Sequence, residues 1–85
     1  GTMSQRFHSR KAKVRGFVTP VEWDKDNKIA RIAICTEAED IFYVDDEVGL
    51  DCLRHALRAY VVVKGFYFVD DKGEKHLELR SIKLH

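Results

Sequence analysis

Apolar and polar residues alternate along much of this chain, and the first clear run lies near its start. Val14, Gly16 and Val18 alternate with charged or polar neighbours, which predicts a strand over about residues 13–23 with these three positions facing a core. Pro20 lies inside this strand. Because proline cannot donate a hydrogen bond to a neighbouring strand, we expect a bulge or a bend at that point.

Two shorter strands are predicted next. In residues 29–36, Ile32 and Ile34 should face the core. The residues that alternate with them should point outward: Arg31, Ala33 and Cys35. Residues 41–44 form a short third strand, from which Tyr43 should point outward and its two neighbours inward.

One helix is predicted, over about residues 50–59. Acidic residues gather before it, and Arg54 and Arg58 lie toward its end, which suits the helix dipole. Its apolar residues fall at helical spacing on a single stripe: Leu50, Leu53, Ala56, Leu57 and Tyr60.

The most apolar stretch is residues 60–69, which is rich in β-branched and aromatic residues and is therefore predicted to be a strand. A hairpin turn follows, with Gly73 in the left-handed conformation, and leads into a last strand over residues 75–84. The apolar positions of that strand change parity partway along it. A bulge near Arg80 and Ser81 would bring them all to one face.

The charged residues of the first and fourth strands predict an outer wall. Arg15 and Lys64 should point outward, because burying an unpaired charge in a small core is costly. Parity then turns four apolar residues outward as well: Phe17, Val62, Phe66 and Phe68. With strands 1 and 4 as neighbours in the sheet, these four side chains should form one aromatic patch on the outer wall, and an exposed patch of this kind is typical of a partner surface. The alternative is cover from within the chain, for which Phe7 is the obvious candidate.

The order of three strands, one helix and two strands resembles the OB-fold, a five-stranded Greek-key β-barrel with its helix between strands 3 and 4. Val14-Arg15-Gly16-Phe17-Val18 is similar to the opening step of OB-fold domains of the anticodon-binding type, and Val63-Lys64-Gly65-Phe66 repeats that step. The resemblance covers nearly all of residues 12–84. It implies a barrel with strands in the order 1-2-3-5-4-1 and glycines that let strands bend around it.

The resemblance also implies a site for single-stranded nucleic acid across strands 2 and 3 and the loops joining strands 1–2 and 4–5. The residues at those places that could stack on bases or contact phosphates are Trp23, Lys25, Lys28, Arg31, Tyr43, Lys72 and Lys75. Acidic residues occupy the same two loops and would repel a polyanion. Trp23 has an alternative role as an aromatic lid on the end of the barrel.

The length of 85 residues predicts one domain, over residues 12–85, and the charge is unevenly placed along it. Residues 1–15 carry five basic and no acidic side chains, whereas residues 16–85 carry ten basic and fourteen acidic ones. A basic arm over residues 1–11 could seek phosphate, or it could be a solvated tail beside a sheet edge. Gly1 and Thr2 resemble residues left by cloning.

Composition and motifs argue against several other classes of protein. No apolar run is long enough for a membrane span, and two widely spaced cysteines favour the cytoplasm, although a Cys35–Cys52 disulfide remains possible. Cys52 and His55 could form half a metal site, but two more ligands with suitable spacing are missing. No catalytic motif is visible, so we expect no enzyme activity, no cofactor and no metal.

Two functions follow as hypotheses. The first is a small, stand-alone cytoplasmic OB-fold protein that binds single-stranded DNA or RNA without catalysis. The alternative is a protein-interaction module or homodimer that uses the outer wall of strands 1 and 4. The two hypotheses place the partner on different parts of the surface.

Overall fold

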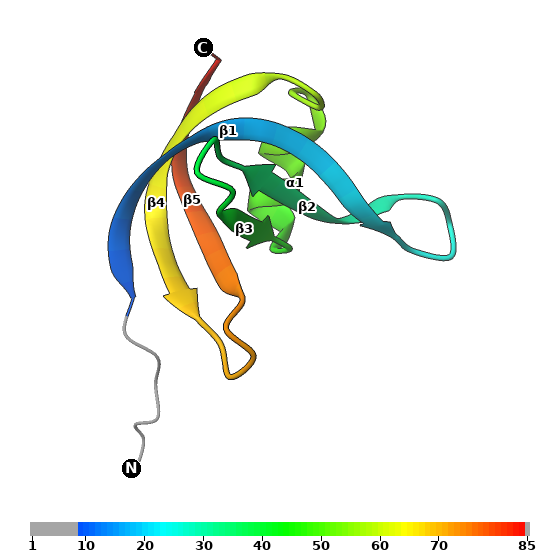
Figure 1. The fold of residues 1–85 in the computed structure, drawn as a ribbon. Helices are drawn as coiled ribbons and strands as arrows, with labels where there is room; N and C mark the ends of the chain where they lie inside the picture. The colour runs from blue at the N-terminus through cyan, green and yellow to red at the C-terminus, as the bar shows by residue number, and fades with distance from the viewer. Residues whose placement is uncertain (1–8, 85) are drawn as a thin grey trace.

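The computed structural model describes residues 9–84 and shows a closed five-stranded barrel with one helix (Figure 1). Its elements are β1 (Arg10–Trp23), β2 (Ile29–Cys35), β3 (Ile41–Val44), α1 (Glu47–Arg54), β4 (Tyr60–Val69) and β5 (Lys75–Leu84). The strands follow the order β1-β2-β3-β5-β4, with β4 paired back onto β1. The predicted all-β barrel, its strand order and the place of its helix are confirmed, and the architecture is compatible with an OB-fold.

The long strand β1 belongs to both sides of the barrel. Its first part, from Arg10 to Phe17, pairs antiparallel with β4, and its second part, from Phe17 to Trp23, pairs antiparallel with β2. Figure 1 shows β1 arching across the molecule between these partners. Gly16 lies where the strand changes partner, and a Cβ there would meet the backbone carbonyl of Cys35. The glycine is therefore needed for the close approach of two backbones.

Bulges interrupt the pairing of β1 with β2 and of β5 with β4. One lies in β1 after Pro20, where the register with β2 shifts, as the sequence predicts. The other lies in β5, where Ser81 pairs with Lys64 and Leu79 with Gly65, so that Arg80 has no partner in the ladder. This extra residue brings apolar positions of opposite parity to the same face, which confirms the predicted bulge.

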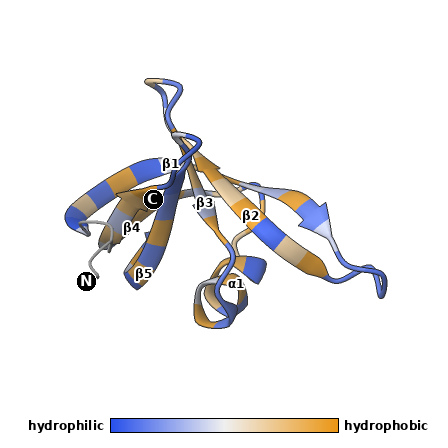
Figure 2. Ribbon diagram, turned by 90° about the horizontal axis from the view of Figure 1, so that it is seen from below, coloured by the Kyte–Doolittle hydropathy of each residue, from blue (hydrophilic) through white to orange (hydrophobic). Residues whose placement is uncertain are grey.

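The core consists of the inward residues of all five strands together with α1. It contains Val14, Val18, Ile32, Ile34, Phe42, Val44, Leu50, Leu53, Ala56, Val61, Val63 and Leu77. Figure 2 shows the alternation of hydrophilic and hydrophobic residues along β1 and β5 that turns one set inward. Arg15 and Lys64 are exposed, as expected. Ala33 was expected to face solvent but is only 2% exposed, because it lies between Thr19 and Tyr43 on the flanking strands.

The helix begins and ends earlier than the sequence pattern suggests. Asp46 caps its N-terminus by accepting a hydrogen bond from the backbone N–H of Gly49 at 2.9 Å. After Arg54 the chain continues through turns rather than helix. Arg58 has a φ of 65°, its N–H donates to the carbonyl of Val18, and the N–H of Val18 donates to the carbonyl of Ala59. The predicted end at residue 59 is wrong because these bonds attach the segment to β1.

The structure also bears on the cysteines and on membrane spans. Cys35 is half-buried and Cys52 is exposed, and both are free, so the disulfide alternative does not hold. No helix within residues 9–84 is long and apolar enough to cross a bilayer.

Candidate nucleic-acid interface

The β1–β2 turn carries the most exposed of the predicted stacking residues. Trp23 ends β1 and is 55% exposed, and it does not belong to the core cluster. Figure 1 shows the turn after β1 projecting away from the rest of the barrel. An indole that is more than half exposed and lies outside the core cluster does not close the end of the barrel, so the lid explanation does not describe Trp23.

The same turn is shaped by one carboxylate. Asp24 Oδ1 accepts hydrogen bonds from the backbone N–H groups of Asp26 at 2.8 Å and Lys28 at 3.0 Å. The hydrogen bond from the Lys28 N–H lowers the pKa of Asp24. Asn27 adopts a φ of 65° to complete the turn. The result is a defined turn on which Lys25 and Lys28 are exposed.

Arg31 and Tyr43 are brought together as predicted, but they are occupied with other groups of the chain. The Arg31 guanidinium lies 3.5 Å from Glu22 and 3.2 Å from Asp45, and it also lies 4.9 Å from the centre of the Tyr43 ring. Its positive charge is therefore largely balanced, and one face of Tyr43 is covered. A phosphate or a base would have to compete with these contacts.

The two predicted lysines near the β4–β5 turn differ in whether an acidic side chain of the protein pairs with them. Lys75 Nζ lies 3.3 Å from Asp40 Oδ1 and 5.7 Å from the centre of the Phe42 ring. Lys72 is exposed and makes no side-chain ion pair within residues 9–84. Of these two, only Lys72 offers an uncompensated charge.

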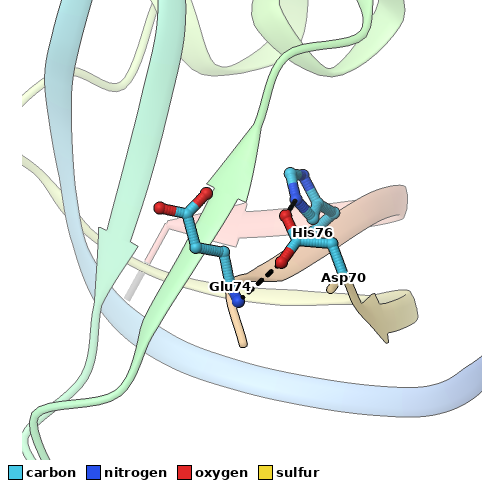
Figure 3. A group of neighbouring side chains, drawn as sticks. All are labelled: Asp70, Glu74 and His76. Carbon is cyan, nitrogen blue, oxygen red and sulfur yellow. Dashed lines mark hydrogen bonds and ion pairs between the residues drawn. The ribbon is translucent and has the colours of Figure 1, made fainter. Parts of the chain in front are cut away.

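Asp70 organises the β4–β5 turn. One of its oxygens accepts from the backbone N–H groups of Lys72 and Glu74, each at 2.9 Å, and the other lies 2.7 Å from Nε2 of His76 (Figure 3). The bond to His76 is the main cause that lowers the pKa of Asp70, followed by the Glu74 N–H. Gly73 has a φ of 85°, which confirms the predicted left-handed position.

His76 is a surface residue for which the sequence reasoning found no role. Its ring stacks on Phe68 with 5.0 Å between centres and 16° between planes, and Tyr43 lies on a neighbouring strand at 6.3 Å. The alternation in β5 places His76 on the same face as Glu78, so the sequence pattern could have predicted that the His76 side chain points outward. Its partners depend on the register of β4 with β5, which the local pattern does not contain.

Asp70, Glu74 and His76 have the donor types of a metal site, and their ligand atoms lie within 4.8 Å of one another. Figure 3 shows the Glu74 carboxylate turned aside from the Asp70–His76 pair. Both oxygens of Asp70 already accept hydrogen bonds from the turn and from the imidazole. The formation of the hairpin thus accounts for the cluster.

The four residues of the predicted outer wall point outward but do not form one patch. Phe17 lies opposite Tyr60, with 5.2 Å between ring centres, whereas Phe66 lies opposite Lys11. Tyr60 and Phe66 are six residues apart along β4, or about 20 Å at the rise of a strand. The expectation of a single continuous apolar surface is therefore wrong.

Cover on these residues comes largely from β5. The guanidinium of Arg80 lies 5.3 Å from the centre of the Phe66 ring, and His76 stacks on Phe68. Val62 is half-buried, and Phe17 is the most exposed of the four, at 53%. Phe7, the cover expected from the sequence, lies outside the described residues.

Comparisons with known proteins add no relative to this description. The family models, curated proteins and solved structures with which the chain was compared include none that matches it.

Proposed function

We propose that this chain is a small OB-fold protein that binds single-stranded nucleic acid without catalysing a reaction. The observation that carries the proposal is the exposure of Trp23 on a projecting turn, next to two exposed lysines, Lys25 and Lys28. An indole at the surface offers a face on which a base can stack, and lysines beside it attract the phosphates on either side. The closed barrel supports the proposal because barrels of this kind often bind oligonucleotides.

Within this proposal, the other predicted residues differ in how available they are to a nucleic acid. Arg31 forms ion pairs with Glu22 and Asp45, and Lys75 forms an ion pair with Asp40. Asp24 faces its own turn and holds it in shape. Trp23 with Lys25 and Lys28 therefore forms the leading part of the site, and Tyr43 and Lys72 are secondary to it.

The protein-interaction hypothesis has less support. It needs Phe17, Phe66 and Phe68 to act together, and the register separates Phe17 from the other two. Arg80 and His76 already cover part of the remaining pair. No observation on residues 9–84 favours a protein partner over a nucleic acid at this wall.

The fluorescence of Trp23 provides a direct test, because it is the only tryptophan in the chain. Titration with short mixed-sequence single-stranded DNA or RNA at low salt should quench this fluorescence as bases stack on the indole. With a labelled oligonucleotide and an anisotropy readout, Trp23→Ala should weaken binding by about 1–3 kcal/mol, the usual contribution of one stacked base.

Val48→Ala is the control, since Val48 is 70% exposed on α1 and plays no part in the proposed site. This variant should bind as the wild type does. If the wild type binds neither DNA nor RNA at low salt, the proposed function is wrong. If it binds and Trp23→Ala has no effect, the function stands but the site is elsewhere.

A further inference from the structure

The outer face of β1, β4 and β5 carries basic residues that form no ion pair within residues 9–84. Its cations are Lys11, Lys13 and Arg15 on β1, Lys64 on β4, and Arg80 and Lys83 on β5. The carboxylates on this face lie toward Phe66 and Phe68: Glu78 is paired opposite Phe66, and Asp45, Asp46 and Glu78 line a hollow with the two rings. The ion pairs within residues 9–84 involve Arg31, Arg54, Lys75 and His76, and none of these six cations. We call these six cations the basic wall.

The register of the strands sets like charges against each other on this wall. Lys13 lies directly opposite Lys64, and Arg15 and Lys83 lie on either side of Val62. Like charges directly opposite in a sheet destabilise it, and here no acid compensates. The repulsion between the two lysines lowers the stability of the fold. An anion bound between them would offset this repulsion, so the pair is expected at a site that binds an external anion.

Protection of a sheet edge does not explain the whole wall. Lysines often discourage edge-to-edge pairing between molecules, and parts of β1 and β5 have one unpaired side. Lys64, however, lies on β4, which is hydrogen-bonded to β1 on one side and to β5 on the other. There is no edge at Lys64 for a charge to protect.

The spacing of the cations and the shape of the surface between them match the phosphate backbone of a single strand. Lys11, Lys13 and Arg15 alternate along β1, so neighbouring cations are about 6.6 Å apart along the strand. This is similar to the separation of successive phosphates in an extended single strand. A surface hollow lies between Lys13, Arg15, Lys64 and Lys83, with Val62 among its lining residues. Next to it, the Arg80 guanidinium lies over the Phe66 ring.

We propose that the basic wall binds the phosphate backbone of the single-stranded nucleic acid. This inference rests on the proposed function and gives it a second surface, away from β2, β3 and the two turns. The row of cations on β1 leads toward Phe17, which is 53% exposed and can stack on a base. Trp23 ends the same strand. The strand β1 thereby joins phosphate contacts at one end to stacking residues at the other.

Three double variants with the same change in charge test this assignment. Lys13→Gln/Lys64→Gln alters the wall, Lys25→Gln/Lys28→Gln alters the β1–β2 turn, and Arg54→Gln/Arg58→Gln alters the helix and the turn after it. Circular dichroism first checks that each variant is folded. The affinity for a labelled short single-stranded oligonucleotide is then measured by anisotropy at several salt concentrations.

The wall variant and the turn variant should both lose affinity, the wall variant by about tenfold or more at low salt, whereas the helix variant should stay close to the wild type. The slope of log K against log salt is negative, and each lost phosphate contact reduces its magnitude by about 0.7 for a single strand. For two contacts, the loss of affinity between about 50 and 200 mM salt should therefore shrink by about sevenfold.

Other outcomes overturn the inference in distinguishable ways. If only the turn variant loses affinity, the basic wall is not the binding surface, whereas the proposed function stands. If the wild type binds no oligonucleotide, both fail. If the wild type binds vesicles containing anionic lipid through the wall and binds no oligonucleotide, the wall recognises a membrane surface and the assignment to nucleic acid is wrong.

Discussion

A single carboxylate, that of Asp70, holds the β4–β5 hairpin through two backbone N–H groups and one imidazole. These bonds favour the ionised form and hold the pKa of Asp70 below its ordinary value in the folded protein. The stabilisation is present at pH above the ordinary pKa, where the carboxylate is ionised in both states. It is lost as the pH falls through the lower, folded-state pKa.

Asp70→Asn should therefore destabilise the protein in a pH-dependent way. The amide keeps one oxygen for the backbone N–H groups but loses the charge that His76 contacts. Thermal unfolding followed by circular dichroism should give a lower Tm than the wild type near neutral pH. The difference should begin to narrow below the ordinary pKa of an aspartate and close as the pH falls through the lower, folded-state pKa. Asp71→Asn, next to it and exposed, is the control and should change the Tm little. A Tm difference that does not vary with pH would contradict this role of the charge.

Among the elements, β4 combines two kinds of residue on opposite faces. Val61 and Val63 are fully buried in the core, whereas Lys64 is exposed opposite Lys13. The inner face is selected for packing, and the outer face carries a charge pair that packing does not require. Stability and binding should therefore respond in opposite directions to a change at Lys64.

Lys64→Gln should raise the free energy of unfolding by about 0.2–1 kcal/mol at low salt, because it removes the repulsion from Lys13. The gain should fade as salt screens the pair. Denaturant titrations at two salt concentrations measure both effects. Lys72→Gln is the control: Lys72 follows two acidic residues, so its loss should not stabilise the protein. A destabilised Lys64→Gln would mean that Lys64 makes a favourable contact in the folded chain.

At the scale of the whole molecule, closure of the barrel divides every strand into an inside and an outside. Phe66 and Val63 are three residues apart on β4, yet Val63 is fully buried while Phe66 lies half-buried on the outer face beside Arg80. The molecule should therefore tolerate a charge at one position and not at the other.

Phe66→Glu should fold with the mass of the wild type, because the carboxylate lies outside the barrel within reach of Arg80. Val63→Glu should unfold the protein or cost more than about 4 kcal/mol, because it buries an unpaired charge. Light scattering measures the mass of Phe66→Glu, and denaturant titration measures the stability of both variants. If the wild type is a dimer and Phe66→Glu is a monomer, the outer wall of β1 and β4 around Phe66 is a protein interface, and this result supports the interaction hypothesis.

The sequence by itself determined which residues face inward along each strand, because the period of two is a local property of the chain. It also located the turn at Gly73 and the bulge near Arg80, since a left-handed glycine and a change of parity can be read from neighbouring residues. The early end of α1 was not readable in this way. It depends on the hydrogen bonds that Arg58 and Ala59 form with Val18, a residue far from both of them in the chain.

Only the tertiary structure decided which surface residues are available to a ligand. Arg31 and Lys64 both look like free cations in the sequence, yet Arg31 is paired with Glu22 and Asp45, whereas Lys64 faces Lys13. The same holds for His76, whose contacts with Asp70 and Phe68 follow from the β4–β5 register. Register between remote strands is set by the packing of the whole barrel, and a one-residue shift would replace every one of these partners.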